Sequence, residues 1–352
     1  LESKEAKRSF LLTELIKGWL LAGTGRVDAA VSHFDQLSQD NNFESFAIYH
    51  KALLQLYLSE YASAEAIITK HFNSGGTATR KILVVLIHSL LHQGRFEEAN
   101  SYIKATFENL EEIQARSLLT AVEEKRHPDY TMVEDIGSGV SEVFYTIAQI
   151  LNGEENSKNT LVFARLAEFL TKDNSAATLL CADVLSKLRQ YDLASRTYSK
   201  ISINSSFHQT AEIGRADVLS KAGQREEAIT VLRKLTQAQP ESFDAFRELA
   251  DELRYSERYS DAAEAYTKAL VLADKQNIKK WRLYYARGMT FERLDRWDIA
   301  EADFRAALKL QPAQPYVLNY LGYSLVEKKI KLEEALAMIE RAVSLRSDNG
   351  YI

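Results

Sequence analysis

The chain is poor in cysteine, proline and glycine. Its 352 residues include one cysteine, Cys181, four prolines and 14 glycines. A single cysteine excludes a disulfide within the chain, and we expect Cys181 to be buried as a small hydrophobic side chain. Proline and glycine both destabilise helix interiors, so their scarcity favours a chain that is mostly helical.

The charge balance and the short apolar runs exclude two classes of partner. The chain has 44 Lys and Arg against 49 Asp and Glu, a net charge of −5, and no dense run of cations. Nucleic-acid binding depends on clustered cations that neutralise phosphates, so we expect no nucleic acid as a partner. No apolar run approaches the roughly 20 residues of a membrane helix, so we also expect no membrane span.

Motifs for catalysis and metal binding are missing as well. The run Gly137-Ser138-Gly139 lacks the GK[ST] ending of a phosphate loop and the GxGxxG of a dinucleotide site, and we expect a turn there. His88 and His92 are four residues apart, but the sequence HSLLH lacks the glutamate of the HExxH zinc motif. We therefore predict that the chain is not an enzyme and has no catalytic, metal-binding or cofactor-binding residue.

What the chain does contain is a 34-residue repeat, clearest in residues 281–314. Large, small and aromatic side chains alternate there at set positions: Tyr284, Gly288, Phe291, Trp297, Ala300, Phe304, Ala307 and Pro312. Further copies in a strict 34-residue register begin at Ser141, Ser175, Gln209 and Phe243. The apolar spacing of three and four residues predicts two helices per copy, joined near position 15 by a turn of glycine or a polar residue.

This pattern resembles the tetratricopeptide repeat (TPR). The resemblance implies an all-α fold, a right-handed TPR superhelix (α-solenoid) of about nine helix-turn-helix repeats, in which stacking provides the core. Residues 139–151, 282–312 and 315–352 are similar to a longer, poorly characterised bacterial TPR family. Members of that family begin with an export signal, so the resemblance favours the periplasm or cell envelope over the cytoplasm.

The regularity of the repeats divides the chain. We predict about three TPR-like repeats in residues 1–110, six repeats in 141–349 and the start of a further repeat in 350–352. Residues 111–140 break the register, as an irregular connection or a degenerate repeat, and form either a long loop, a kink or a ligand-contacting loop. Four residues inserted at 277–280 lengthen another loop. Because Ile339, Val343 and Leu345 lack a following repeat, we expect the parent protein to continue or another chain to cover them.

In TPR proteins, side chains at positions 2, 5, 9, 12 and 13 of the first helix line the concave groove. The resemblance therefore implies two sets of candidate binding residues. We call the first the N-terminal set: Leu15, Trp19, Phe46, Tyr49, Leu53 and Tyr57, with Leu12 and Leu56 beside them. The second is the C-terminal set: Arg247, Asp251, Arg254, Tyr255, Arg282, Tyr285, Met289, Arg293, Tyr316, Asn319 and Tyr323.

Each set has a structural alternative. The apolar N-terminal set could instead pack against a preceding segment or a tucked-in loop of the chain. The C-terminal set could be a solvated face with internal ion pairs, such as Arg247 with Asp251 one helical turn away. Its tyrosines and arginines are, however, typical of binding hot spots.

The predicted function is that of a protein-interaction scaffold. It would hold an extended or helical segment of a protein or peptide partner in the concave groove. Two alternatives remain open at this point. One is a structural component that self-associates through the exposed ends of the array, and the other is an envelope protein whose tyrosines bind cell-wall glycan.

Overall fold

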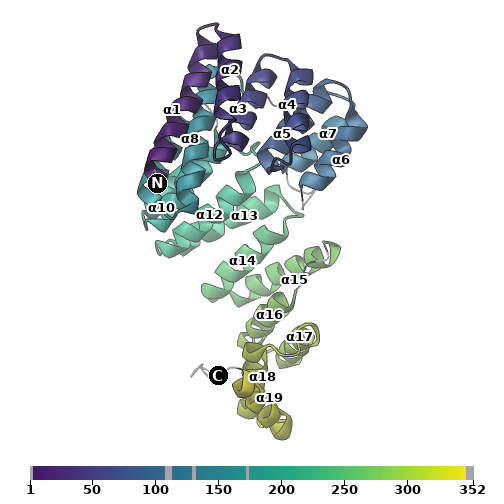
Figure 1. Ribbon diagram of the computed structural model, residues 1–352. Coiled ribbons are helices and arrows are strands. Elements are labelled where there is room, and N and C mark those ends of the chain that lie inside the picture. The colour runs from purple at the N-terminus through teal and green to yellow at the C-terminus, as the bar shows by residue number, and fades with distance from the viewer. Residues whose placement is uncertain are drawn as a thin grey trace. The chain divides into compact units, whose positions relative to one another are not determined.

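The structure is a computed structural model that describes residues 3–107, 113–128, 132–171, 174–276, 278 and 280–345. Within those residues it has 19 α-helices and no β-strand, so the predicted all-α repeat fold is confirmed (Figure 1). The predicted start of a repeat at 350–352, and residues 277 and 279 of the predicted insertion, lie outside the described residues.

The helices fall into two compact units, residues 1–211 (unit 1) and 212–352 (unit 2). Unit 1 contains α1 (Lys4–Gly23), α2 (Val27–Leu37), α3 (Glu44–Tyr57), α4 (Tyr61–Asn73), α5 (Arg80–His92), α6 (Phe96–Thr106), α7 (Ile113–Glu123), α8 (Ile136–Gly153), α9 (Ser157–Leu170), α10 (Ser175–Lys187) and α11 (Tyr191–Tyr198). The boundary falls within α12 (His208–Lys221). Unit 2 continues with α13 (Arg225–Ala238), α14 (Phe243–Tyr255), α15 (Tyr259–Lys275), α16 (Trp281–Arg293), α17 (Trp297–Leu310), α18 (Pro315–Glu327) and α19 (Leu332–Leu345).

One backbone feature recurs along both units. In each predicted repeat, the residue at position 15 has a positive φ and ends the first helix of the pair. One more turn of this kind follows α7. The described residues that end a first helix with a positive φ are Gly25, Ser59, Gly94, Lys125, Glu155, Arg189, Gly223, Glu257, Asp295 and Lys329. After each of them, the next N–H donates to the carbonyl five residues back, as from Arg26 to Leu21 (3.0 Å). This is the Schellman termination of a helix, which turns the chain back so that the second helix can pack on the first.

The short reversal brings the predicted small residues against large ones. A Cβ atom added to Gly288 of α16 would lie 2.7 Å from the ring of Phe304 on α17, which is fully buried. Gly18 of α1 has the same relation to Phe34 of α2, at 2.4 Å. Glycine is required at these two positions because the aromatic ring occupies the space of a side chain.

Residues 113–128 form only half of a repeat. Helix α7 ends at the left-handed Lys125 like every first helix, but the next helix among the described residues is α8, whose N-cap is Asp135. Helix α8 then pairs with α9 as the first helix of the following repeat.

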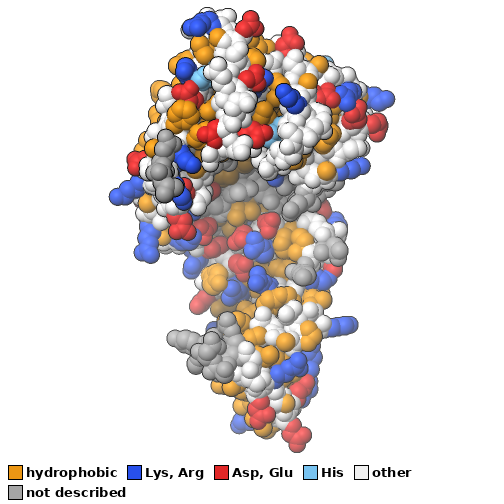
Figure 2. Space-filling model, in the orientation of Figure 1, with side chains coloured by type: hydrophobic (Ala, Val, Ile, Leu, Met, Phe, Trp, Pro, Cys, Tyr) orange, Lys and Arg blue, Asp and Glu red, His pale blue; other side chains and the backbone are white. Residues whose placement is uncertain are grey.

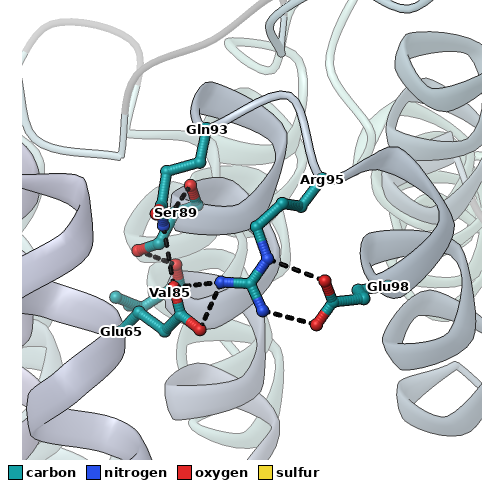
Figure 3. Close-up of polar contacts among 6 residues, drawn as sticks. All are labelled: Glu65, Val85, Ser89, Gln93, Arg95 and Glu98. Carbon is teal, nitrogen blue, oxygen red and sulfur yellow. Dashed lines mark hydrogen bonds and ion pairs between the residues drawn. The ribbon is translucent and has the colours of Figure 1, made fainter.

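Ion pairs connect helices both between neighbouring repeats and within one repeat. In unit 1, Arg95 lies in the turn before α6 and its guanidinium contacts Glu65 of α4 (2.5 and 2.6 Å) and Glu98 (2.7 Å) (Figure 3). In unit 2, Arg287 makes two 2.8 Å hydrogen bonds to Asp303, which is buried. Breaking a buried pair of this kind leaves a charge uncompensated, so the Arg287–Asp303 pair fixes how α16 and α17 pack.

The left-handed turns predict opposite effects of two substitutions in unit 2. Glu257→Gly should raise the free energy of unfolding by about 1 kcal/mol, because glycine adopts a positive φ without the steric cost of a side chain. Gly223→Ala should lower it by about the same amount, since its φ is +82°. Urea denaturation followed by the emission of Trp281 and Trp297, in a Trp19→Phe background, measures both. A gain from Gly223→Ala would contradict the assigned turn.

Two candidate binding faces

The C-terminal set lies on α14, α16 and α18, the first helices of three successive pairs in unit 2. None of its eleven side chains is buried, and Tyr255, Tyr316 and Tyr323 are 57%, 44% and 54% exposed. Over α14 to α16, acidic and basic side chains are mixed with hydrophobic ones (Figure 2). The set is therefore accessible within its unit.

A polar chain organises the α14 part of this set. The Tyr266 hydroxyl donates to Oδ1 of Asp251, and Nε of Arg254 donates to the Tyr266 oxygen (3.1 Å). The Arg254 guanidinium also lies 4.3 Å from the ring centroid of Tyr255. Asp251 fixes the Tyr266 hydroxyl, and Tyr266 in turn holds Arg254. The charge of Arg254 is therefore held over the exposed ring of Tyr255.

Tyr285 of α16 stands at the centre of an aromatic group. Its ring meets Tyr320 edge-on with centroids 5.8 Å apart, and lies 6.1 Å from Phe304. Burial raises the pKa of Tyr285, and the nearby Arg254 opposes that shift. Tyr320 donates to Glu292, which also accepts from Ser324 at 2.9 Å. Aromatic pairs of this geometry are rigid, so the ring of Tyr285 is pre-positioned.

The ion pair between Arg247 and Asp251, which the sequence offered as an alternative to binding, does not form. Arg247 instead contacts Asp244 (3.2 Å) and Glu248 (2.7 Å), while Asp251 is engaged by Tyr266. The second helix of the pair supplies Tyr266 as a competing donor, which spacing along α14 alone does not reveal.

The remaining members of the C-terminal set differ in their contacts and burial. Arg282 lies over the ring of Trp281 (5.3 Å), and neither Arg282 nor Arg293 forms an ion pair with another described residue. The Oδ1 atom of Asn319 is shielded from solvent and has no hydrogen-bond partner among the described residues. Met289 packs partly buried at the edge of the core.

The N-terminal set has a different environment. Leu15, Trp19, Tyr49 and Leu53 are buried, Phe46 is half-buried, and Tyr57 is 36% exposed. Helix α8 lies beside α1 and also contacts α3, although it begins at Ile136 and α3 already ends at Tyr57 (Figure 1). A later helix of the same chain thus contacts Trp19 and Tyr49 of this set, where the sequence suggested a preceding segment or a loop.

The closest approach of α8 is at Gly139. A Cβ atom there would lie 2.3 Å from the indole of Trp19, whose Nε1 donates to Nδ1 of the buried His50 (3.1 Å). The turn expected at Gly137-Ser138-Gly139 is therefore wrong, since all three residues belong to the first turns of α8. Asp135 and Ser138 form a capping box that starts the helix, and the absence of a side chain at Gly139 lets α8 approach the indole.

A lysine held by aromatic and acidic groups reinforces this contact. Nζ of Lys81 on α5 lies 2.6 Å from Oε1 of Glu142 on α8, and the Tyr49 hydroxyl donates to the same oxygen (3.1 Å). Lys81 also lies 5.4 Å from the Tyr49 ring and 4.8 Å from that of Tyr145. Burial and the charge of Glu142 raise the pKa of Tyr49, so its hydroxyl stays protonated as a donor.

Comparison with known proteins agrees with this architecture. A family model described as tetratricopeptide repeat matches residues 213–277 and 285–351. Residues 213–277 and 285–351 are therefore tetratricopeptide repeats. A TPR repeat-containing protein of Pseudomonas aeruginosa is 29% identical over 143 residues, 40% of this chain, and the match spans 24% of that relative's length.

Solved structures of other TPR proteins resemble parts of this chain. The C-terminal part of a TPR repeat-containing protein from Cytophaga hutchinsonii is 14% identical and matches 75% of this chain and 96% of its own, with a TM-score of 0.52. A fragment of MamA from Desulfovibrio magneticus is 20% identical and matches 49% of this chain and 96% of its own, with a TM-score of 0.43. TPR proteins are generally non-catalytic scaffolds that bind protein or peptide partners.

Several residues of the TPR faces escaped the sequence analysis. Glu292 occupies position 12 of its repeat, so the same rule of positions finds it. Tyr266 and Tyr320 occupy positions 24 and 6, which usually serve packing, and only the fold shows their hydroxyls reaching Asp251 and Glu292. Glu142 could not be found, because its partners Tyr49 and Lys81 lie in other repeats.

The structure also places the residues weighed for chemistry. His88 is buried, whereas the His92 ring stacks between Tyr61 (4.3 Å) and His127 (4.7 Å). Among the described residues no group of three or more His, Cys, Asp or Glu side chains could hold a metal ion, and no helix is long and apolar enough to cross a membrane. Cys181 is buried as predicted, and burial raises its pKa to about 12.

Two of the three glycines of α8, Gly139 and Gly153, predict contrasting effects of substitution. Gly139→Ala should destabilise unit 1 by about 1–3 kcal/mol, because the added methyl group overlaps the Trp19 ring. Gly153→Ala is the matched control: its Cβ meets nothing within 4 Å, so the greater helix propensity of alanine should leave stability unchanged or slightly higher. Urea denaturation followed by Trp19 emission compares them, and equal effects would show that α8 does not seat on Trp19.

Proposed function

We propose that the chain is a non-enzymatic scaffold whose unit 2 binds a segment of a protein partner along α14, α16 and α18. The observation that most supports this proposal is that the C-terminal set is exposed and partly held in fixed positions. All eleven side chains keep exposed surface, while Arg254, Tyr285 and Tyr320 are held in place by fixed neighbours. Rigid aromatic and arginine anchors lose little conformational entropy on binding, which favours affinity.

The charges suggest what the partner segment carries. Two of the four arginines of the C-terminal set are already paired within the chain, Arg247 with Asp244 and Glu248, and Arg254 with Asp251. Arg282 and Arg293 form no ion pair with another described residue and are exposed. A segment with carboxylates near one or two apolar side chains would meet both cations and the tyrosine rings.

The N-terminal set is assigned a structural role in this proposal. Trp19 and Tyr49 contact α8 of the same chain, and the buried members of the set belong to the core of unit 1. Self-association through the ends of the array and glycan binding remain alternatives that no contact of the described residues favours.

The proposal is tested by substituting exposed side chains that form no ion pair with another described residue. The triple variant Arg282→Ala, Arg293→Ala and Tyr323→Ala should lower recovery of co-purifying chains by about tenfold or more in affinity capture, since hot-spot residues each contribute about 1 kcal/mol or more. Helicity by circular dichroism should not change.

A control variant carries three equally exposed substitutions on the second helices of unit 2: Lys309→Ala, Leu310→Ala and Arg341→Ala. It should recover the same chains as the unmodified protein. Undiminished recovery by the first variant would exclude the α14–α16–α18 face as the binding site. Equal losses in both variants would mean that the effect is not specific to that face.

A further inference from the structure

The histidines of this chain are distributed very unevenly. All seven lie between residues 33 and 208, which places them in unit 1, and residues 212–352 contain none. Four of them, His33, His50, His71 and His88, are buried. Histidine is the side chain whose ordinary pKa lies closest to neutrality, so protonation between about pH 5 and pH 8 affects the two units differently.

His50 lies directly beneath the contact of α8. Its Nδ1 accepts the hydrogen bond from Trp19, which leaves the proton of the neutral ring on Nε2. That N–H has no acceptor among the described residues. The charged form would need a proton on Nδ1 as well, and this proton would displace the indole on which Gly139 sits.

The groups around His50 disfavour its charged form. Lys81 of α5 is the charged neighbour, and burial together with Lys81 lowers the pKa of His50 to about 3. Glu142 of α8, which could compensate a positive charge, is already engaged by Lys81 (2.6 Å) and the Tyr49 hydroxyl (3.1 Å). The positive charge of a protonated His50 would therefore be buried beside Glu142, whose own charge is already neutralised by Lys81.

His88 on α5 is a second buried neutral ring. Burial and the neighbouring His92 lower its pKa to about 3. The ring of His92 stacks on Tyr61 and on His127, and its own pKa is lowered by burial and by His127. His33 and His71 are different, because each lies against a carboxylate, Glu14 at 3.2 Å and Glu44 at 2.9 Å.

We propose that unit 1 contains an acid-sensitive switch built on His50 and His88. As the pH falls from about 7.5 to about 5.5, α8 loosens from Trp19 and unit 1 opens, while unit 2 keeps its fold.

The sign of the effect follows from the two states. In the open or unfolded chain each ring titrates near its ordinary pKa of about 6.5, well above its value in the folded unit. The open state therefore binds more protons, so the stability of unit 1 is full above pH 6.5 and decreases as the pH falls below it. Carboxylates contribute little in this window, since they titrate mainly below about pH 5.

Tryptophan emission reads the two units separately. In the full chain with Trp281→Phe and Trp297→Phe, Trp19 reports unit 1 alone, and in Trp19→Phe the other two report unit 2. Urea titrations at pH 7.5 and 5.5 should show the unfolding equilibrium constant of unit 1 rising about tenfold per histidine, or about 100-fold for the pair. The unit 2 transition should not move.

The double variant His50→Gln and His88→Gln removes both titrating rings while keeping an acceptor for the Trp19 indole. Its unit 1 transition should lose about 100-fold of the pH dependence. A Trp19 transition that is the same at both pH values, or a parallel shift of both units, would overturn the proposal. Should the double variant fail to fold, the single variant His50→Gln keeps the test, since it should lose about tenfold of the pH dependence; an unchanged pH dependence would overturn the proposal.

Discussion

The structure depends on one backbone constraint, the left-handed residue that ends the first helix of each pair. Ten such residues reverse the chain among the described residues, and each reversal is closed by the same hydrogen bond to the carbonyl five residues back. The reversal places Gly288 beneath Phe304 and Gly18 beneath Phe34. Only three of the ten are glycines, so packing of the helix pairs has to offset the cost of seven strained side-chain-bearing residues.

Local features of this kind could be predicted from the sequence. The 34-residue spacing identified the pairs, the turn at position 15 and the glycines that meet aromatic rings. The contacts that could not be predicted join residues far apart in the sequence. Nothing in the repeat pattern shows that Gly139 approaches Trp19 or that Glu142 meets Lys81, because these contacts join repeats that are not neighbours in sequence. The same limit explains why the sequence left a pair of Asp251 with Arg247 open, although Tyr266 of the next helix competes for Asp251.

Equivalent positions of the repeat therefore have different roles in the two units. In unit 1 the face formed by Leu15, Trp19 and Leu53 is covered by α8, and it contributes to a core that includes Val143 and Ile147 of that helix. In unit 2 the corresponding positions on α14, α16 and α18 remain accessible, with Arg254 and Tyr285 fixed by neighbours. A repeat position specifies where a side chain points, and the rest of the chain decides whether a partner can reach it.

The covering of unit 1 by its own helix is tested most directly by carbodiimide cross-linking, which joins an amine to a carboxylate only when the two are in contact. Lys81 and Glu142 are 2.6 Å apart across 61 residues, and Lys51 and Asp35 are an internal control at 2.6 Å within neighbouring helices. At neutral pH and low protein concentration, we predict a Lys81–Glu142 cross-linked peptide beside the Lys51–Asp35 peptide. Formation of the Lys51–Asp35 peptide without the Lys81–Glu142 peptide would contradict the placement of α8 on this face.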